Sequence, residues 1–401
     1  MEVGKKTPAV RRRVGQCAPV PEGPGILAQL GEAFDALAQR CRAPITARRP
    51  WLEAWIESNR AYRPVAVYVY EDDQMLAGLA LFGVRPRLLG TEVVGLGHGA
   101  SDQSRLYAVD DDAARKLAIA VTTGLRSLPR PWRMTLAQLP ADDSAVKALK
   151  FALPHHLVLT APGSPMILIT EDRTPGRYLT SNYRGQAKNK WNRMVKDGVS
   201  PKIETLTGAE QIAAVLPAVM AIAEIRNEEL TGNRKLHEPN RAAFFRAVVL
   251  EHARRGEVEL LLLYIAGEIG AYSLNFKDGT SLRMWSSHYH PRWADYSPGH
   301  VLSRVLVERC VACPETEVLD WMKGLEAYKL RTANHIEPAQ SLRAWSGLGG
   351  RSAGQATEWL RTFLKKARAR YPILHRLQIR VRQQLGRIRG AHPSLAGKQE
   401  P

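Results

Sequence analysis

The sequence predicts a mixed α/β (α+β) fold with two similar modules in tandem, each a mostly antiparallel twisted sheet flanked by helices, and a basic helical tail. Tight turns join β-rich runs, for example across residues 71–74 and at Ala266-Gly267, which is typical of antiparallel hairpins. Both halves repeat the order helix, strand, tight turn, strand, further strand, helix, strand. With 401 residues and 45% hydrophobic content, the chain can form two domains with sizeable cores.

In the first half, the spacing of apolar residues predicts alternating helices and strands. Residues 26–41 carry apolar side chains at helical intervals, and a second short helix starts at Trp51. Asp111 and Asp112 open a further helix, since carboxylates favour the first turn. The predicted helices span 26–41, 51–56, 111–128 and 144–151, and the predicted strands span 64–70, 75–82, 132–139 and 166–169, while 93–102 forms a strand end that runs into a glycine-rich loop.

The second half repeats this order. A basic linking helix is expected within residues 175–198, and Asp278-Gly279 marks a hairpin turn between two strands. The further predicted helices span 212–229, 240–255 and about 297–312, and the predicted strands span 258–265, 268–276, 281–287 and 317–322.

The helix that starts at Ser297-Pro298-Gly299 is the central feature of this half. Serine is a favoured N-cap residue, and proline suits the first helical position. A helix start directs free N–H groups and the positive end of a dipole at one point, so it can bind phosphate without a metal. The charged cluster after the next strand is expected nearby. The order strand, helix start, strand, polar cluster therefore indicates a cofactor site beside a catalytic site.

Basic residues are concentrated in three segments, which together carry the whole formal net charge of +18. Residues 1–13 hold five Lys/Arg against one acidic residue, residues 184–202 hold six against one, and residues 358–401 hold eleven against two. The folded body is therefore balanced in charge. The predicted division is a disordered basic arm (1–24), a first module (25–172), a basic linker helix (173–204), a second module (205–350) and a basic amphipathic tail (351–401).

The tail from residue 357 on interleaves apolar and basic residues, and Pro372 is expected to break or kink it. A basic amphipathic helix can lie on an anionic membrane surface, and it can equally pack its apolar stripe on the body. Nucleic acid is a weaker candidate partner, because no aromatic stacking platform accompanies the charge.

The cysteines are too few for a disulfide framework, since the chain has four. Cys310 and Cys313 share an apolar helix face with Leu302 and Leu306, so we expect a buried structural role and no metal site. The sequence shows neither a run of about 18 apolar residues nor a secretory signal, so we expect a cytoplasmic protein, with the inner membrane face as a peripheral location.

The residues Ser297-Pro298-Gly299, Asp320, Gly324, Glu326 and Tyr328-Lys329 together resemble the C-terminal signature of the CelD-type acetyltransferases. This family belongs to the GNAT superfamily and is associated with cellulose or exopolysaccharide biosynthesis. The resemblance covers roughly residues 51–346. It implies two tandem GNAT-like modules, with acetyl-CoA or another acyl-CoA as donor and an amine or hydroxyl of a small molecule or cell-envelope saccharide as acceptor. The first module is degenerate, because three aspartates open its corresponding helix and would repel a pyrophosphate.

The resemblance also implies roles for single residues. The phosphate loop is expected at Tyr296, Ser297, Pro298, Gly299 and His300, and a backbone N–H between Met284 and Ser287, around Ser286, is expected to polarise the acyl carbonyl. An ordinary N-capped helix is the structural alternative for this loop.

Other residues are expected to move protons or orient the acceptor. Tyr328 is the candidate acid for the leaving thiolate, or else a half-buried helix tyrosine. Asp320 and Glu326 are candidate bases or acceptor-orienting carboxylates, and Lys329 holds an anion or pairs with Glu326 three residues back. Asp102 on the glycine-rich loop matches a family position. Three histidines are weaker candidates: His98, His288 and His290.

Two further functional hypotheses stay open. A FemABX-type aminoacyl transferase pairs two similar modules and uses aminoacyl-tRNA, for which the basic linker and tail are suitable. An inactive GNAT-like pair that binds an envelope-synthesis partner through its tail is the non-enzymatic hypothesis. The basic linker helix is a solvated connection or a positive rim for a CoA phosphate.

Overall fold

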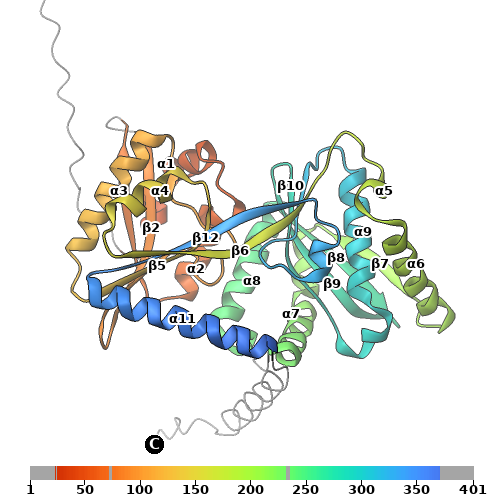
Figure 1. Cartoon of the computed structure of the whole chain (residues 1–401). Helices are drawn as coiled ribbons and strands as arrows, with labels where there is room; N and C mark the ends of the chain where they lie inside the picture. The colour runs from red at the N-terminus through yellow and green to blue at the C-terminus, as the bar shows by residue number, and fades with distance from the viewer. Residues whose placement is uncertain (1–22, 24, 72–74, 232–234, 371–401) are drawn as a thin grey trace, which may run out of the picture.

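In the computed structural model, which describes residues 23, 25–71, 75–231 and 235–370, one continuous sheet runs through both halves of the molecule (Figure 1). The strand order is β1-β2-β3-β5-β12-β6-β11-β10-β9-β8-β7, with β4 paired to β2. All neighbours are antiparallel except β3 with β5 and β10 with β11. The predicted fold class is confirmed, and the two expected sheets are joined edge to edge.

The strands are β1 (Arg63–Tyr70), β2 (Leu76–Arg87), β3 (Gly90–Gly95), β4 (Tyr107–Ala108), β5 (Trp132–Pro140), β6 (His156–Leu168), β7 (Lys202–Leu206), β8 (Val258–Ile265), β9 (Glu268–Asp278), β10 (Ser281–Tyr289), β11 (Val318–Asp320) and β12 (His335–Trp345). The helices are α1 (Ile26–Arg40), α2 (Arg49–Ser58), α3 (Asp111–Arg126), α4 (Ser144–Ala152), α5 (Pro175–Tyr178), α6 (Ser181–Lys196), α7 (Ala209–Thr231), α8 (Pro239–Arg254), α9 (Pro298–Ala312), α10 (Ala327–Leu330) and α11 (Leu348–Arg370), with 3-10 turns η1 (Ile45–Ala47), η2 (Lys235–His237) and η3 (Pro291–Tyr296).

Most predicted elements are present with similar bounds. The helix at Ser297-Pro298-Gly299 becomes α9, and the hairpin at Ala266-Gly267 joins β8 to β9 through two residues with positive φ angles of 54° and 80°. Such a pair of angles is the one that a two-residue hairpin turn requires.

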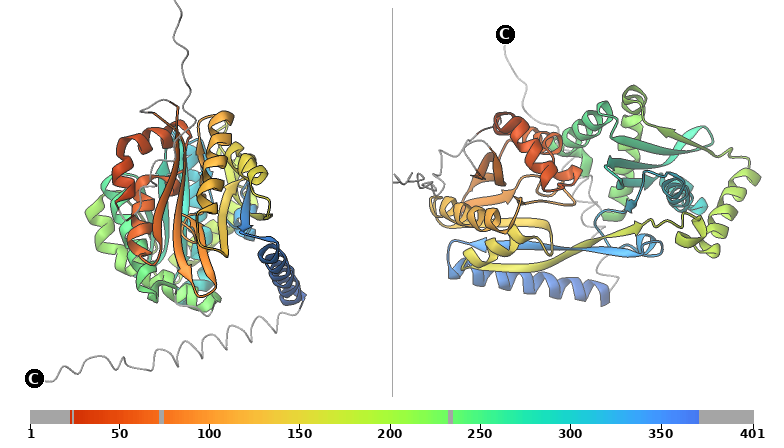
Figure 2. Two further views of the ribbon diagram at one scale, coloured as in Figure 1. Left: turned by 90° about the vertical axis from the view of Figure 1, so that its left-hand side faces the viewer. Right: turned by 90° about the horizontal axis from the view of Figure 1, so that it is seen from above.

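Strand β12 connects the two halves. It follows α10, but it returns to the first half and inserts between β5 and β6, from the pair His335–Met166 to the pair Ala344–His156. Figures 1 and 2 show β6 and β12 running side by side from one half of the molecule to the other. Residues 335–345, which the sequence groups with the second module, thus supply a strand to the sheet of the first.

Strand β6 is much longer than the predicted strand at 166–169. The part before Met166 contains Pro162, Gly163 and Pro165, which indicate a loop when the sequence is considered alone. The segment is extended because β12 pairs with it along its length. At Gly163, an added Cβ would lie 2.6 Å from the carbonyl oxygen of Glu337, so glycine allows the two strands to approach closely there.

Three apolar clusters stabilise the sheet. One lies within the first half under α3 and α4, and one lies under α6 and α9 in the second half. The third spans both halves, because α2 packs against α8 and joins α1 in one apolar cluster with residues of α7, α8, β8 and β9. Trp51 on α2 contacts the rings of Phe244, Phe276 and Trp285 with centroid distances of 5.6, 5.5 and 5.2 Å. The two halves therefore share a core and hold each other in a fixed arrangement.

The basic tail begins as α11, which lies along β12 and β6 on one side of the molecule (Figure 1). The ion pair between Arg343 and Glu358, 2.7 Å long, ties it to the sheet. Residues 1–22 and 24 of the predicted arm (1–24), and the predicted break at Pro372, lie outside the described residues. Within the described part, no helix has both the length and the hydropathy to span a membrane.

The two cysteines of α9 differ in their surroundings. Cys310 is buried, and burial raises the pKa of its thiol, which agrees with the predicted structural role. Cys313 is the C-cap residue and is half-buried. Among the described residues, no three His, Cys, Asp or Glu side chains gather where they could hold a metal ion.

Candidate active site

Strands β10 and β11 separate at the centre of the sheet. They pair in parallel only from Ser281–Val318 to Arg283–Asp320. The chain after Asp320 then follows β6 instead, since the Trp321 N–H donates to the Pro165 carbonyl at 3.0 Å and the Gly324 N–H to the Gly163 carbonyl at 3.1 Å. Residues 284–289 of β10 therefore border an opening, and no strand among the described residues pairs with this edge.

A free strand edge can hold an extended ligand. Its N–H and C=O groups need partners, and an amide-containing chain can supply them as an added strand would. A β-bulge between Met284 and Ser286 changes the direction of this edge beside the opening. Ser286, one of the predicted site residues, exchanges a hydrogen bond of 2.8 Å with the Tyr272 hydroxyl. The opening is thus bordered by backbone groups and small hydroxyl side chains.

The start of α9 follows β10 through η3. Ser297 occupies the N-cap position, but its φ of 47° is left-handed and its side chain makes no capping hydrogen bond, contrary to the expected serine cap. Pro298 occupies the first turn as predicted. Within the described part of the chain, an added Cβ at Gly299 would meet only the Tyr289 ring, at 3.7 Å. The first turn of this 15-residue helix therefore keeps its capacity to bind an anion.

His300, in the same turn, lies against Tyr183 of α6 with a ring distance of 4.0 Å. Its Nε2 is buried and has no hydrogen-bond partner among the described residues, and burial lowers the pKa of the imidazole. The neutral ring thus forms part of the wall beside the helix start.

The basic helix α6 packs beside this loop. The Lys190 ammonium donates to the Asp295 carbonyl at 3.0 Å, and the Arg193 guanidinium lies 5.4 Å from the centre of the Tyr296 ring. The Tyr296 hydroxyl donates to Asp197 at 3.0 Å, and this hydrogen bond raises the pKa of the tyrosine. The linker helix thus places positive charge next to the α9 start.

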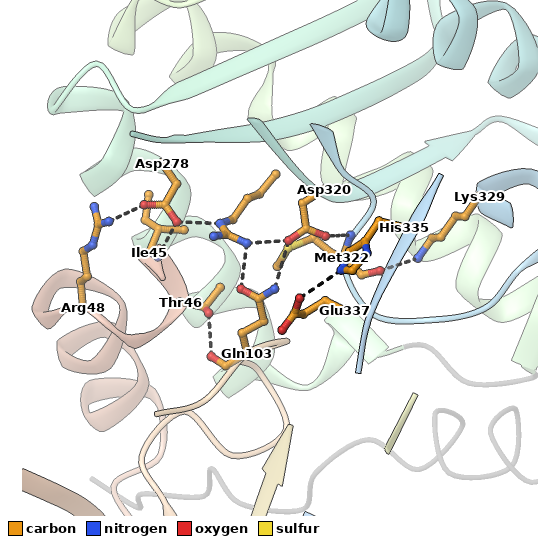
Figure 3. A network of polar contacts seen from close by, with 11 residues as sticks. Ile45, Thr46, Arg48, Gln103, Asp278, Asp320, Met322, Lys329, His335 and Glu337 are labelled. Carbon is orange, nitrogen blue, oxygen red and sulfur yellow. Dashed lines mark hydrogen bonds and ion pairs between the residues drawn. The ribbon is translucent and has the colours of Figure 1, made fainter. Parts of the chain in front are cut away.

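Asp320 is fully buried at the end of β11 (Figure 3). One carboxylate oxygen pairs with Arg283 at 2.5 Å and accepts from the Gln103 amide at 3.0 Å, and the other accepts from the Met322 N–H at 2.8 Å. Burial raises the pKa of Asp320, although Arg283 opposes this rise. Both oxygens are occupied, so the carboxylate fixes the strand ends on either side of the opening.

The network continues into the first half. Arg283 also donates to Asp278 at 2.6 Å, and Asp278 pairs with Arg48 and accepts from the Ile45 N–H at 3.1 Å (Figure 3). Gln103 accepts from Arg283 at 2.8 Å. Residues far apart in sequence are thereby held around the last residue pair that joins β10 and β11.

The glycine-rich loop reaches the same region through Asp102. Its carboxylate pairs with Lys323 at 2.5 Å, so the predicted Asp102 of the first half lies beside the segment that follows Asp320. His98 is exposed, and the Tyr272 and His288 rings lie 5.9 Å apart. His290 accepts from the Arg292 N–H at 3.3 Å at the start of η3.

The segment from Met322 to Lys329 is held by its own charges. The Lys329 ammonium is buried and donates to the Lys323 carbonyl at 2.7 Å. It also pairs with Glu326 at 3.1 Å, as the salt-bridge alternative predicts. Tyr328 lies edge-on to Trp321 with a ring distance of 6.3 Å, and burial raises the pKa of its hydroxyl.

The predicted site residues thus fall in three groups, apart from Ser286 on β10. Tyr296, Ser297, Pro298, Gly299 and His300 lie at the α9 start, whereas Asp102 and Asp320 lie at the junction of the two halves, and Glu326, Tyr328 and Lys329 lie on the segment after β11.

Sequence reasoning missed several polar residues of the junction. Gln103, Asp278 and Arg283 form part of the network around Asp320, and His335 and Glu337 lie on β12. The alternation of polar and apolar residues from His335 onwards is a strand signal that could have indicated β12, although not its partners.

Comparisons with known proteins concern the second half of the chain and the overall fold. Residues 181–330 match the family model described as an acetyltransferase (GNAT) domain, so the chain contains such a domain. The match includes the β10–β11 opening and the α9 start, whereas Asp102, Gln103 and β12 lie outside it. Among the curated proteins, none matches the chain.

Solved structures share the fold over most of the chain. The crystal structure of FemX superposes with a TM-score of 0.54 at 10% identity, covering 78% of this chain and 95% of that one. A conserved protein of unknown function from Bacteroides thetaiotaomicron gives 0.51 at 12% identity, covering 81% and 99%. The C-terminal domain of a putative lysylphosphatidylglycerol synthetase from Agrobacterium fabrum gives 0.50 at 10% identity, covering 83% and 96%. At these identities the similarity concerns the fold alone.

Proposed function

We propose that the chain is a CelD-type acyltransferase that moves an acetyl or longer acyl group from acyl-CoA to an amine or hydroxyl of a small-molecule or cell-envelope saccharide acceptor. The observation that carries the proposal is the edge of β10 at residues 284–287, with which no described strand pairs, beside the start of α9. An elongated ligand with a phosphate end and an amide-containing arm matches this pair of features, and acyl-CoA is such a ligand.

The donor would be held by charge and by backbone. Its phosphates would bind at Ser297, Pro298, Gly299 and His300, with Tyr296 and the basic side chains of α6 at the rim. Its arm would pair with the edge of β10, and an N–H between Met284 and Ser287 would polarise the thioester carbonyl. None of these interactions needs a metal ion.

Proton transfer would involve the residues after β11. Tyr328 would protonate the leaving thiolate, because a hydroxyl whose pKa is raised by burial stays protonated at neutral pH. Asp320 would hold Arg283 and Gln103 in place on the acceptor side of the opening. Glu326 and Lys329 would fix the conformation of the loop beside the reacting groups through their ion pair. Asp102 would hold that loop through Lys323.

Calorimetry with acetyl-CoA and with longer acyl-CoA thioesters tests the donor. We expect saturable binding of at least one thioester, weakened by salt because part of the affinity comes from phosphate contacts. Absence of binding to all of them would exclude the proposal.

The second candidate is aminoacyl transfer from aminoacyl-tRNA, as in FemABX-type enzymes. The basic α6 beside the α9 start favours it, since α6 could contact a tRNA backbone. A tRNA gel-shift series across salt concentrations distinguishes the donors. Tight and steeply salt-dependent binding would support the tRNA hypothesis, and absence of a shift together with acyl-CoA binding would support the leading one.

For α11 we propose contact with an anionic membrane surface at the cytoplasmic side. Trp359, Leu360 and Phe363 are 71%, 50% and 56% exposed on this helix, and the surrounding sequence is strongly basic. Apolar side chains beside positive charge are typical of interfacial helices. Co-sedimentation with phosphatidylglycerol vesicles should exceed that with phosphatidylcholine vesicles, and replacing all three apolar residues by serine should abolish the difference.

An inactive adaptor remains the non-enzymatic alternative. Removal of residues 357–401 distinguishes the enzyme hypothesis from the adaptor hypothesis. An enzyme should retain turnover of soluble substrates, whereas an adaptor that works through its tail should lose its partner.

A further inference from the structure

A histidine and a carboxylate lie side by side on β12, at the junction of the two halves. The Nε2 atom of His335 lies 3.3 Å from Oε2 of Glu337, and both side chains are partly exposed, at 41% and 45% (Figure 3). Both residues lie outside the matched acetyltransferase domain. The proposed function has so far given them no role.

The strand register places His335 on the same face of the sheet as Asp320. Arg283 of β10 pairs with Asp320 of β11, Asp320 pairs with Met166 of β6, and Met166 pairs with His335 of β12. Directly paired residues project their side chains to the same face. His335 thus faces the side on which Asp320 meets Gln103 from the first half, as Figure 3 shows.

Glu337 continues the polar surface two residues further along β12. It pairs with Ser164 of β6, whose side chain is buried. The close approach at Gly163 and a β-bulge between Glu337 and Ala339 fix the backbone at this position. A pair carried by paired strands is held more rigidly than one carried by a loop.

Asp320 and the His335 imidazole differ in whether they can accept a proton from a bound acceptor. Asp320 is 0% exposed and both of its oxygens are occupied, so it cannot readily accept a further proton from a bound acceptor. The imidazole is partly exposed and, among the described residues, has Glu337 as its one hydrogen-bond partner. When Nε2–H donates to Glu337, Nδ1 retains its lone pair and can accept a proton.

The strand order sets the distance that an acceptor would have to span. Strand β12 lies two strands from β11, which is about 10 Å at the usual inter-strand spacing. Met166 and Ser164 of β6 are buried on this face, so an acceptor would lie above these two side chains, with the imidazole on one side and the β10–β11 opening on the other. It would reach the opening from the face opposite to α9, since α9 packs with Leu282 and Leu319, which alternate with Arg283 and Asp320.

We propose that His335, oriented by Glu337, is the general base that deprotonates the acceptor. This inference depends on the proposed acyl-transfer function and extends it to the acceptor side. The acceptor nitrogen or oxygen forms a bond to the acyl carbon, its proton passes to Nδ1 of His335, and the carbon–sulfur bond breaks. The thiolate takes a proton from Tyr328, the imidazolium releases its proton to solvent, and Tyr328 regains a proton from solvent. Glu337 holds the ring and stabilises its positive charge.

Turnover of the full-length protein tests the proposal. Acetyl-CoA is the donor, glucosamine and water are the acceptor probes, and thiol release is the readout. We expect His335→Gln to lower kcat by about 100-fold or more while the KM for acetyl-CoA and its calorimetric Kd stay unchanged, since general bases contribute roughly 10²–10⁴-fold. Added imidazole should restore part of the rate in this variant. A smaller loss is expected for Glu337→Gln, because the imidazole remains but loses its orientation.

Two further variants make the test specific. His335 and Glu337 should act as a unit, so the double variant should be no slower than His335→Gln alone. His156→Gln is the matched control, because this histidine lies at the opposite end of the β6–β12 pair, and its kcat should equal that of the parent. Circular dichroism spectra should coincide for all variants, since His335 and Glu337 are partly exposed.

The outcomes separate the two proposals. If the parent protein does not bind acetyl-CoA, the acyl-CoA function itself is wrong. If the parent binds and turns over acetyl-CoA but His335→Gln retains its full kcat, the donor assignment stands and the general-base assignment is overturned.

Discussion

Arg283 and Asp320 form an ion pair, with Nη1 and Oδ2 2.5 Å apart, at the last residue pair that joins β10 to β11. Beyond this pair the two strands separate, and the opening between them is the proposed donor site. The buried ion pair thus sets the point at which the sheet divides.

Asp320→Asn should therefore disturb both stability and turnover. Removing one charge of a buried pair leaves the other poorly compensated, at a cost of about 3 kcal/mol, although Asp278 still pairs with Arg283. The free energy of unfolding in urea should fall accordingly, and kcat should fall while acyl-CoA binding remains. The exposed pair of Asp112 with Lys116 serves as control, and Asp112→Asn should leave the urea midpoint unchanged. A fully stable Asp320→Asn protein with parental kcat would contradict this role.

Gly299→Val should weaken donor binding without unfolding the protein. The added side chain finds space beside Tyr289, but it covers the helix start where the phosphates would bind. We expect a loss of affinity of about tenfold or more, or roughly 1.4 kcal/mol, in calorimetry with acetyl-CoA. Gly124→Val in α3 is a matched helix substitution far from the site and should leave the affinity intact. Parental affinity in Gly299→Val would show that the Ser-Pro-Gly turn is only a helix start.

Tyr328→Phe should slow the chemical step and spare binding. Loss of the acid that protonates the thiolate should lower kcat by about 100-fold. Because the pKa of this hydroxyl is raised, the parent rate should not fall through the mildly alkaline range on account of Tyr328. The measurements are kcat as a function of pH and the Kd for acetyl-CoA. An unchanged kcat at every pH would exclude Tyr328 as the acid.

Glu92 should make stability depend on pH. Its burial raises the pKa of the carboxyl, but the guanidinium groups of Arg85 and Arg133 outweigh this and hold the pKa at about 2, below the ordinary value of 4.5. A carboxylate with a lowered folded-state pKa stabilises the fold above its unfolded-state pKa, and this stabilisation disappears as the pH falls through the folded-state pKa. Glu92→Gln should therefore be less stable than the parent at neutral pH.

The difference between the urea midpoints of the parent and Glu92→Gln should narrow as the pH falls from about 4.5 through 2, because protonation makes Glu92 as neutral as glutamine. A difference that stays constant over this range would show that lost packing, and not charge, causes the effect.

Single helices and hairpins could be predicted from the sequence, because the residues that indicate each of them lie close together in the chain. The α9 helix follows from Pro298 and the apolar spacing after it, and the β8–β9 hairpin follows from Ala266-Gly267. Ser297 shows the limit of such reasoning. It is a favoured capping residue type, yet η3 brings the chain into the helix through a left-handed residue whose side chain does not reach the first-turn N–H groups.

The candidate site was predicted only in part, because long-range pairing assembles it. Asp102 and Asp320 were both proposed from the sequence, but their association through Gln103 and Lys323 depends on how the two halves pack. Strand β12 pairs with the part of β6 before Met166, although more than 150 residues separate them in the sequence. Pro162 and Pro165 make β6 hard to recognise as a strand from the sequence alone. His335 and Glu337 were missed for that reason.

The position of β12 also has a consequence for biosynthesis. The first half cannot complete its sheet during translation until residue 345 has left the ribosome, because β5 and β6 do not pair along their length but each pair with β12. The nascent first half therefore exposes two unpaired strand edges while the second half is synthesised, and edges of this kind favour aggregation. The sheet of the first half is therefore completed only near the end of synthesis, and premature termination before β12 would leave β5 and β6 without the strand that joins them.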